Sequence, residues 1–118
     1  MRYNDLEVYK KLIILNNKVY NITLNFPKFE KYELGSQLRR SANSIPANLA
    51  ESFGNKQVNI YLQGISIGMG ELRETRHHLF TAFQRNYIEE IEYNDLLFKY
   101  EECSKMLYGL EMAIKKSI

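Results

Sequence analysis

The sequence predicts an all-α fold, an up-down-up-down four-helix bundle with a proline-kinked second helix, formed by residues 1–118 as a single domain. Three observations support this prediction. Apolar residues recur at three- and four-residue steps through four segments, as on one face of an α-helix. No segment shows the sustained alternation of a β-strand. The connections between the segments are short, which is typical of antiparallel neighbours in a bundle.

The first helix is expected from about Asp5 to Leu24. Its apolar face consists of Leu6, Tyr9, Leu12, Ile13, Val19, Tyr20 and Thr23. The residue before a proline is pushed out of the helical region, so the helix should end before Pro27. Residues 25–33 are expected to form a linker rich in aromatic and charged groups.

The second helix is expected over residues 34–53, although it contains a proline. Its apolar face consists of Leu34, Leu38, Ala42, Ile45, Leu49 and Phe53. Pro46 removes one helical hydrogen bond and its ring clashes with the carbonyl of Ala42, at a cost of about 3 kcal/mol. Either two helices meet at Pro46 or one helix is kinked there, and the unbroken apolar face favours the kink. Gly54 then begins the turn that ends the helix.

The third helix is expected from about Val58 to Arg85. Its apolar face has a heptad-like spacing and consists of Tyr61, Ile65, Gly68, Leu72, Thr75, Leu79 and Ala82. Gly64, Gly68 and Gly70 each cost up to about 1 kcal/mol relative to alanine within a helix. These glycines therefore predict that another helix approaches closely.

The fourth helix is expected from about Glu92 to Lys116. Its apolar face consists of Leu96, Tyr100, Cys103, Leu107, Leu110 and Ile114. Two lysines in its last turn interact favourably with the helix dipole.

Composition places the chain among globular proteins. Hydrophobic residues make up 45% and charged residues 25% of the 118 residues, which argues against intrinsic disorder. No apolar run approaches the ~18 residues of a membrane span, and the first residues lack a signal-peptide core. A cytoplasmic location without membrane association is therefore expected. The single cysteine, Cys103, excludes an internal disulfide and any multi-cysteine metal site.

Charge is nearly balanced but unevenly distributed. Residues 1–59 contain nine Lys or Arg against five Asp or Glu, whereas residues 60–118 contain seven against nine. The pI of 8.6 is below the value of about 9 that strong nucleic-acid binders usually exceed. This polarity is compatible with head-to-tail self-association and also with RNA binding.

No arrangement of residues predicts catalysis, a metal site or another cofactor. Glu74 and His77 have the spacing of one half of a di-iron site, but such a site needs a second motif and further glutamates on facing helices. The other histidine, His78, points about 100° away from His77, so we expect a solvated pair. Cys103 lies on an apolar face, where a free cysteine is usually a small buried hydrophobic residue. No glycine loop follows a strand to bind phosphate, and the chain is expected not to be an enzyme.

Basic side chains are the better candidates for a functional site. The candidates for nucleic-acid contact lie on the second helix, its following turn and the third helix: Arg39, Arg40, Lys56, Arg73 and Arg76. Nine tyrosines and six phenylalanines are available to stack on unpaired bases. The alternative is that these cations lie on ordinary solvated helix faces or form salt bridges between subunits.

One segment carries a specific family resemblance. Residues 36–51 read SQLRRSANSIPANLAE and closely resemble the signature SQLRRAAxSIPANIAEG of the 23S rRNA-intervening sequence proteins, a bacterial family. Further motifs follow in the family's order, at residues 5–9 (DLxVW), 26–32 (the FPxxExYG linker), 68–75 (GSxxELxT) and 105–110 (KMLxGL). The resemblance covers nearly the whole chain. The chain departs from the family pattern at Tyr9, Glu33, Gly35, Ser52 and Asn55.

The resemblance implies a four-helix bundle that assembles into a ring-like homopentamer. Some members of the family are encoded within intervening sequences of 23S rRNA genes. A related accessory protein of diversity-generating retroelements forms a similar basic pentamer that binds nucleic acid and a reverse transcriptase. The signature residues to which we assign a structural role are Ser36, Gln37, Pro46, Asn48, Glu51 and Gly68.

Two functions remain open. The first is an oligomeric accessory protein that binds RNA or DNA through phosphate contacts, and the second is a structural adaptor that binds a protein partner and no nucleic acid. Arg39 and Arg40 either contact phosphate or pair with carboxylates such as those of Glu51 or Glu71. A contiguous basic face would favour the first function, and basic groups consumed in subunit interfaces would favour the second.

Overall fold

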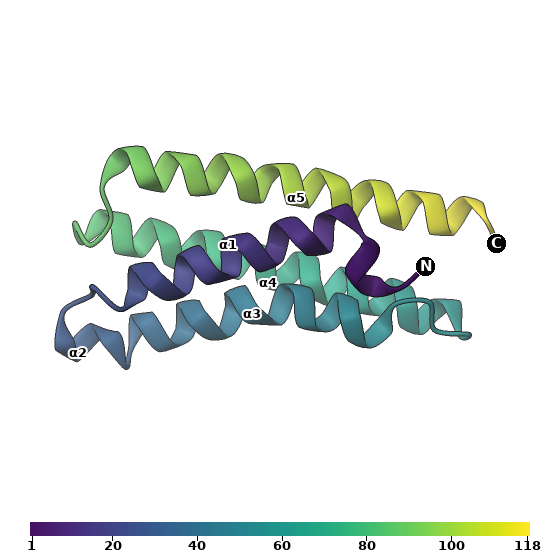
Figure 1. The fold of residues 1–118 in the computed structure, drawn as a ribbon, viewed down its shortest axis with the longest axis horizontal. Coiled ribbons are helices and arrows are strands. Elements are labelled where there is room, and N and C mark those ends of the chain that lie inside the picture. The colour runs from purple at the N-terminus through teal and green to yellow at the C-terminus, as the bar shows by residue number, and fades with distance from the viewer.

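The computed structural model describes all residues from 1 to 118 and contains helices but no strands. Its elements are a short 3₁₀ helix, η1 (Tyr3–Asp5), and the α-helices α1 (Glu7–Thr23), α2 (Lys28–Lys31), α3 (Leu34–Ser52), α4 (Val58–Gln84) and α5 (Glu90–Lys116). The four long helices form a body of 48 × 24 × 20 Å, in which α1 contacts α3 and α5, and α4 contacts α3 and α5. The chain reverses direction between consecutive long helices (Figure 1). The predicted all-α, four-helix fold is confirmed.

The predicted helix boundaries differ from the observed ones mainly near the N-terminus and in the first connection. Residues 3–5 form η1 rather than the start of α1, and the main-chain N–H of Arg2 donates to Asp5 Oδ2 at 2.9 Å. The expected linker over residues 25–33 contains the single turn α2. This turn begins directly after Pro27, whose missing N–H costs nothing at a helix start because no helical partner exists there.

Helix α3 runs through Pro46 without interruption. The alternative in which two helices meet at this proline is therefore wrong, whereas the kink remains a prediction. The Pro46 ring is buried, so its packing offsets part of the lost hydrogen bond.

The apolar faces predicted for the last three long helices are largely those that form the core. All seven residues predicted for α4 are buried, as are five of the six for α3 and the first four of the six for α5. The prediction for α1 is partly wrong, because Tyr20 is 52% exposed. The buried face of α1 consists of Val8, Leu12, Leu15, Val19, Ile22 and Thr23. No helix combines the length and apolar character that crossing a membrane requires.

Helices α3 and α4 form the closest pair in the bundle. A methyl group added at Gly64 would lie 1.9 Å from Ser52 Oγ and 3.1 Å from the Asn48 carbonyl oxygen, and one at Gly68 would lie 3.5 Å from the Ile45 carbonyl oxygen. The predicted close approach is thus confirmed at these two glycines. At Gly70 the nearest atom belongs to an arginine side chain, 3.8 Å away, and no helix lies against it.

A buried carboxylate joins two loops at one end of the bundle. Glu30, on α2, is only 6% exposed. Its Oε2 accepts hydrogen bonds from Arg85 Nη1 at 2.6 Å and from the Tyr87 hydroxyl at 3.0 Å. A buried carboxylate is stable only when it is paired and hydrogen-bonded. The contacts of Glu30 with Arg85 and Tyr87 therefore hold the connection between α1 and α3 against the connection between α4 and α5.

The thiol of Cys103 lies in the core, as its place on an apolar face predicts. Burial raises the pKa of Cys103 to about 11. The neighbouring Tyr100 is also fully buried, and its hydroxyl has no hydrogen-bond partner. Burial accordingly raises the pKa of Tyr100 well above its ordinary value.

Replacing Gly64 by alanine should lower the free energy of unfolding by about 1–3 kcal/mol, because the added methyl group overlaps Ser52 and forces α3 and α4 apart. Gly109→Ala is the matched control. It lies within α5 with no atom near the added methyl group, so this variant should gain up to about 1 kcal/mol. Urea unfolding measures both values. Equal changes in the two variants would contradict the close α3–α4 contact.

Cys103 should react slowly with an aromatic disulfide reagent at pH 8, and quickly after unfolding in guanidinium chloride. The folded protein holds the thiol proton more tightly than the unfolded chain does, because the pKa of Cys103 is raised. Rapid labelling of the native protein would show that this part of the core is open.

Because the folded chain holds the Cys103 thiol proton more tightly, the free energy of unfolding should fall as the pH rises from the ordinary thiol pKa to about 11, which urea unfolding across this pH range measures.

Candidate nucleic-acid interface

Arg39, the first arginine of the signature segment, is bonded within the subunit. Its Nη1 donates to Thr23 Oγ1 at 2.9 Å, and its Nη2 donates to the Lys31 carbonyl oxygen at 3.0 Å. The side chain crosses Gly35, where an added methyl group would lie 3.0 Å from Nη1. The guanidinium therefore ties the end of α1 and the turn α2 to α3, and these two donors are not free to contact phosphate.

Arg40 joins α3 to α4 through two carboxylates. Its Nη1 donates to Glu71 Oε2 at 2.9 Å, and its Nη2 donates to Glu74 Oε2. These carboxylates, chiefly Glu71, raise the pKa of Arg40. Of the two alternatives for this arginine, the pairing with Glu71 is the one observed, whereas Glu51 is exposed and forms no ion pair within the chain.

A buried hydroxyl pair lies beside these contacts. Thr75 Oγ1 donates to Ser41 Oγ at 2.9 Å between α4 and α3, and both side chains are buried. Buried hydroxyl groups need such partners, since an unpaired one costs about 1–3 kcal/mol. The arginine, carboxylate and hydroxyl contacts together fix the register of α3 on α4.

The other signature residues divide into those that are bonded or buried within the chain and those that are exposed. Asn48 Nδ2 donates to the Ser44 carbonyl oxygen at 2.7 Å, one turn earlier on the same helix. Pro46 and Gly68 are both buried, and Gly68 lies against the Ile45 carbonyl oxygen of α3. Ser36 and Gln37 are exposed in the first turn of α3, so nothing within one chain explains why they belong to the signature.

The histidine pair is not uniformly solvated, which corrects the sequence-based expectation. His77 is exposed, whereas His78 is buried and its Nε2 lies 3.3 Å from Glu74 Oε2. Because four residues make about one helical turn, Glu74 faces His78 rather than His77. No group of three or more His, Cys, Asp or Glu side chains is arranged to hold a metal ion.

Arg73 and Arg76 lie on a different part of the surface and come together in a shallow groove. The groove has a volume of about 410 Å³ and is lined by Arg73, Arg76, His77, Phe80, Tyr93 and Leu97. Arg73 is exposed and has no carboxylate partner, and Arg76 Nη2 lies 4.0 Å from Glu101 Oε2 at the surface. The groove thus offers two cations beside apolar and aromatic side chains.

Tyr93 lines this groove but is only 9% exposed. Its ring stacks on Phe83 with centroids 4.4 Å apart and planes inclined by 2°. Burial raises the pKa of Tyr93, so the phenol stays neutral near pH 7. Neither this tyrosine nor Phe80 was predicted to belong to a site. A signal was present in the sequence, because Arg73, Arg76, His77 and Phe80 have the three- and four-residue spacing of one helix face.

Lys56 is separate from the groove. It is exposed in the turn between α3 and α4. The stretch of α4 from Val58 to Arg73 spans about 22 Å at the usual rise per residue. The five predicted cations therefore divide into two that are bonded within the fold, two in the groove and one at a distant turn.

Arg39→Ala should lower the free energy of unfolding by about 1–3 kcal/mol, because two hydrogen bonds are lost and the connection around α2 is released. Arg73→Ala removes the same charge from an exposed position without a partner, and should change stability by no more than about 0.5 kcal/mol. Thermal or urea unfolding distinguishes the two variants. The assignment of Arg39 to the fold fails if both variants are as stable as the parent protein.

Comparison with known proteins agrees with the sequence signature. The family model described as 23S rRNA-intervening sequence protein matches residues 4–109. A solved structure from Bacteroides thetaiotaomicron, a protein of unknown function from the S23 ribosomal protein family, superposes with a TM-score of 0.83 at 22% identity, covering 95% of this chain and 99% of that one. No curated protein matches the sequence. On the strength of the family match, the chain belongs to the 23S rRNA-intervening sequence protein family.

Proposed function

We propose that the protein is a non-enzymatic, oligomeric accessory protein that associates with RNA through the groove of Arg73 and Arg76. This proposal rests on one observation: Arg73, which forms no ion pair, lies in the same groove as aromatic side chains. Arginines contact phosphate, and aromatic rings stack on unpaired bases, so a single-stranded RNA suits this surface best. The family's name connects it with RNA genes, which supports the same class of ligand.

RNA would bind weakly to the groove of a single subunit and more strongly to an assembly of several subunits. One groove supplies two arginine side chains, and linked copies of a site raise avidity when one RNA reaches several of them. The proposed assembly is a homopentamer, as the family resemblance implies, and the proposed location is the cytoplasm. The basic first half and the acidic later segment of the chain suit a head-to-tail contact between subunits.

A structural adaptor that binds a protein partner is the second candidate. The internal bonds of Arg39 and Arg40 favour it, since they remove two of the five expected cations from the nucleic-acid surface. Large apolar side chains on the surface also favour a protein contact: Phe29, Tyr32, Ile91 and Phe98.

Arg73→Gln/Arg76→Gln should weaken binding of a fluorescent single-stranded RNA and make the affinity less dependent on salt. Each phosphate contact to a single strand contributes about 0.7 to the slope of log affinity against log salt, so the slope should fall by about 1.4. Fluorescence anisotropy across a sodium chloride series provides this slope.

The matched control is Lys115→Gln/Lys116→Gln, which removes the same charge from the exposed end of α5. This control should leave the slope nearly unchanged. Equal losses in both double variants would indicate a general charge effect and contradict a site at the groove. A parent protein that ignores RNA at low salt would favour the adaptor.

Light scattering coupled to size-exclusion chromatography should give a mass about five times that of the 14.0 kDa chain. A monomer over the micromolar range would contradict both proposed functions, because each depends on an assembly.

A further inference from the structure

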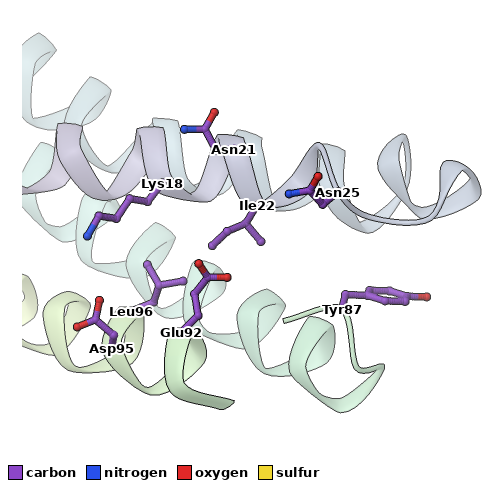
Figure 2. A pocket seen from close by; sticks show the side chains of 8 residues that line it. All are labelled: Lys18, Asn21, Ile22, Asn25, Tyr87, Glu92, Asp95 and Leu96. Atoms are coloured by element: carbon purple, nitrogen blue, oxygen red, sulfur yellow. The ribbon is translucent and has the colours of Figure 1, made fainter. Parts of the chain in front are cut away.

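A groove between α1 and α5 contains two adjoining hollows that share one lysine. The larger has a volume of about 320 Å³, and Figure 2 shows Lys18 extending from α1 toward α5 above Asp95. The smaller has a volume of about 220 Å³ and is lined by Lys11, Ile14, Leu15, Lys18, Lys99 and Glu102. Three lysines from two helices therefore line the smaller hollow beside one carboxylate, that of Glu102, whereas Glu92 and Asp95 line the larger hollow.

These lysines are incompletely neutralised. Lys99 Nζ lies 3.0 Å from Asp95 Oδ2, one turn earlier on α5. Lys11 and Lys18 have no carboxylate oxygen within 4.0 Å. Long lysine side chains on a surface normally spread into water, where like charges stay apart. Here the packing of α1 on α5 keeps three of them around one hollow.

Lys18 and Lys99 line the same hollow from α1 and α5, and Asp95 raises the pKa of Lys99. The proximity of Lys99 lowers the pKa of Lys18, and Asp95 and Glu92 offset this effect only in part. The fold thus holds the ammonium group of Lys18, which has no ion pair, beside that of Lys99, which is paired with Asp95. A bound anion would accept hydrogen bonds from both ammonium groups, and each such charge-assisted contact is about twice as strong as a neutral one.

We propose that the smaller hollow binds a phosphate dianion, either as inorganic phosphate or as the terminal phosphate of a mononucleotide. Lys11, Lys18 and Lys99 supply ammonium donors from α1 and α5. Ile14, which is 58% exposed, and Leu15 form an apolar wall against which the organic part of a mononucleotide can lie. The site is separate from the groove of Arg73 and Arg76, and its occupancy is independent of RNA binding there.

The first test compares binding of inorganic phosphate, adenosine monophosphate and uncharged adenosine by isothermal titration calorimetry at constant ionic strength. Phosphate or the monophosphate should bind and raise the melting temperature, whereas adenosine should do neither. Tighter binding of the monophosphate would identify a mononucleotide as the preferred source of the phosphate, and equal binding would identify free phosphate. If neither phosphate compound binds, the proposal is overturned.

Variants then locate the site. Lys18→Gln should weaken phosphate binding about tenfold or more, because one charge-assisted contact is lost. Without phosphate its melting temperature should not fall, since the substitution also removes repulsion against Lys99. Lys105→Gln is the matched control: it removes the same charge from an exposed position on α5 that forms no ion pair, and should bind phosphate like the parent. Equal affinities in the two variants would overturn the proposed site.

Discussion

The close contact between α3 and α4 is the constraint on which the rest of the structure depends. It requires glycine at residue 64, where any Cβ would overlap Ser52. The hydroxyl pair of Ser41 and Thr75 then fixes the register of the two helices. Because interiors are packed as densely as organic crystals, a larger side chain at this contact would move a whole helix. Among the small residues of the family signature, Ser41 is explained by this contact.

The same contact decides which cations are available to a ligand. It places Arg40 opposite two carboxylates of α4, and the adjacent turn of α3 directs Arg39 to the end of α1. The signature arginines thus stabilise the fold of the chain itself. Free positive charge lies elsewhere, beside aromatic rings on α4 and in the groove between α1 and α5.

Periodicity was sufficient to predict the four long helices, the core faces of α3 and α4, and the close helix approach at Gly64. It could not predict which arginines were bonded internally, because those bonds join residues 8 to 34 positions apart. The burial of Glu30 was equally hidden, since its partners Arg85 and Tyr87 lie 55 and 57 residues away. Tyr20 was placed in the core because it fits a helical step, but the face of α1 that meets the bundle is offset from it. Such errors arise where tertiary packing selects among several apolar faces of one helix.

The most direct test of this account is the salt dependence of RNA binding by Arg39→Ala/Arg40→Ala, measured together with its stability. If both arginines act within the fold, the variant should lose stability but retain the slope of the parent protein, provided that it is folded under the binding conditions. Circular dichroism at each salt concentration establishes that condition. A slope reduced by about 1.4 in a variant of undiminished stability would assign these arginines to phosphate contacts and contradict the account.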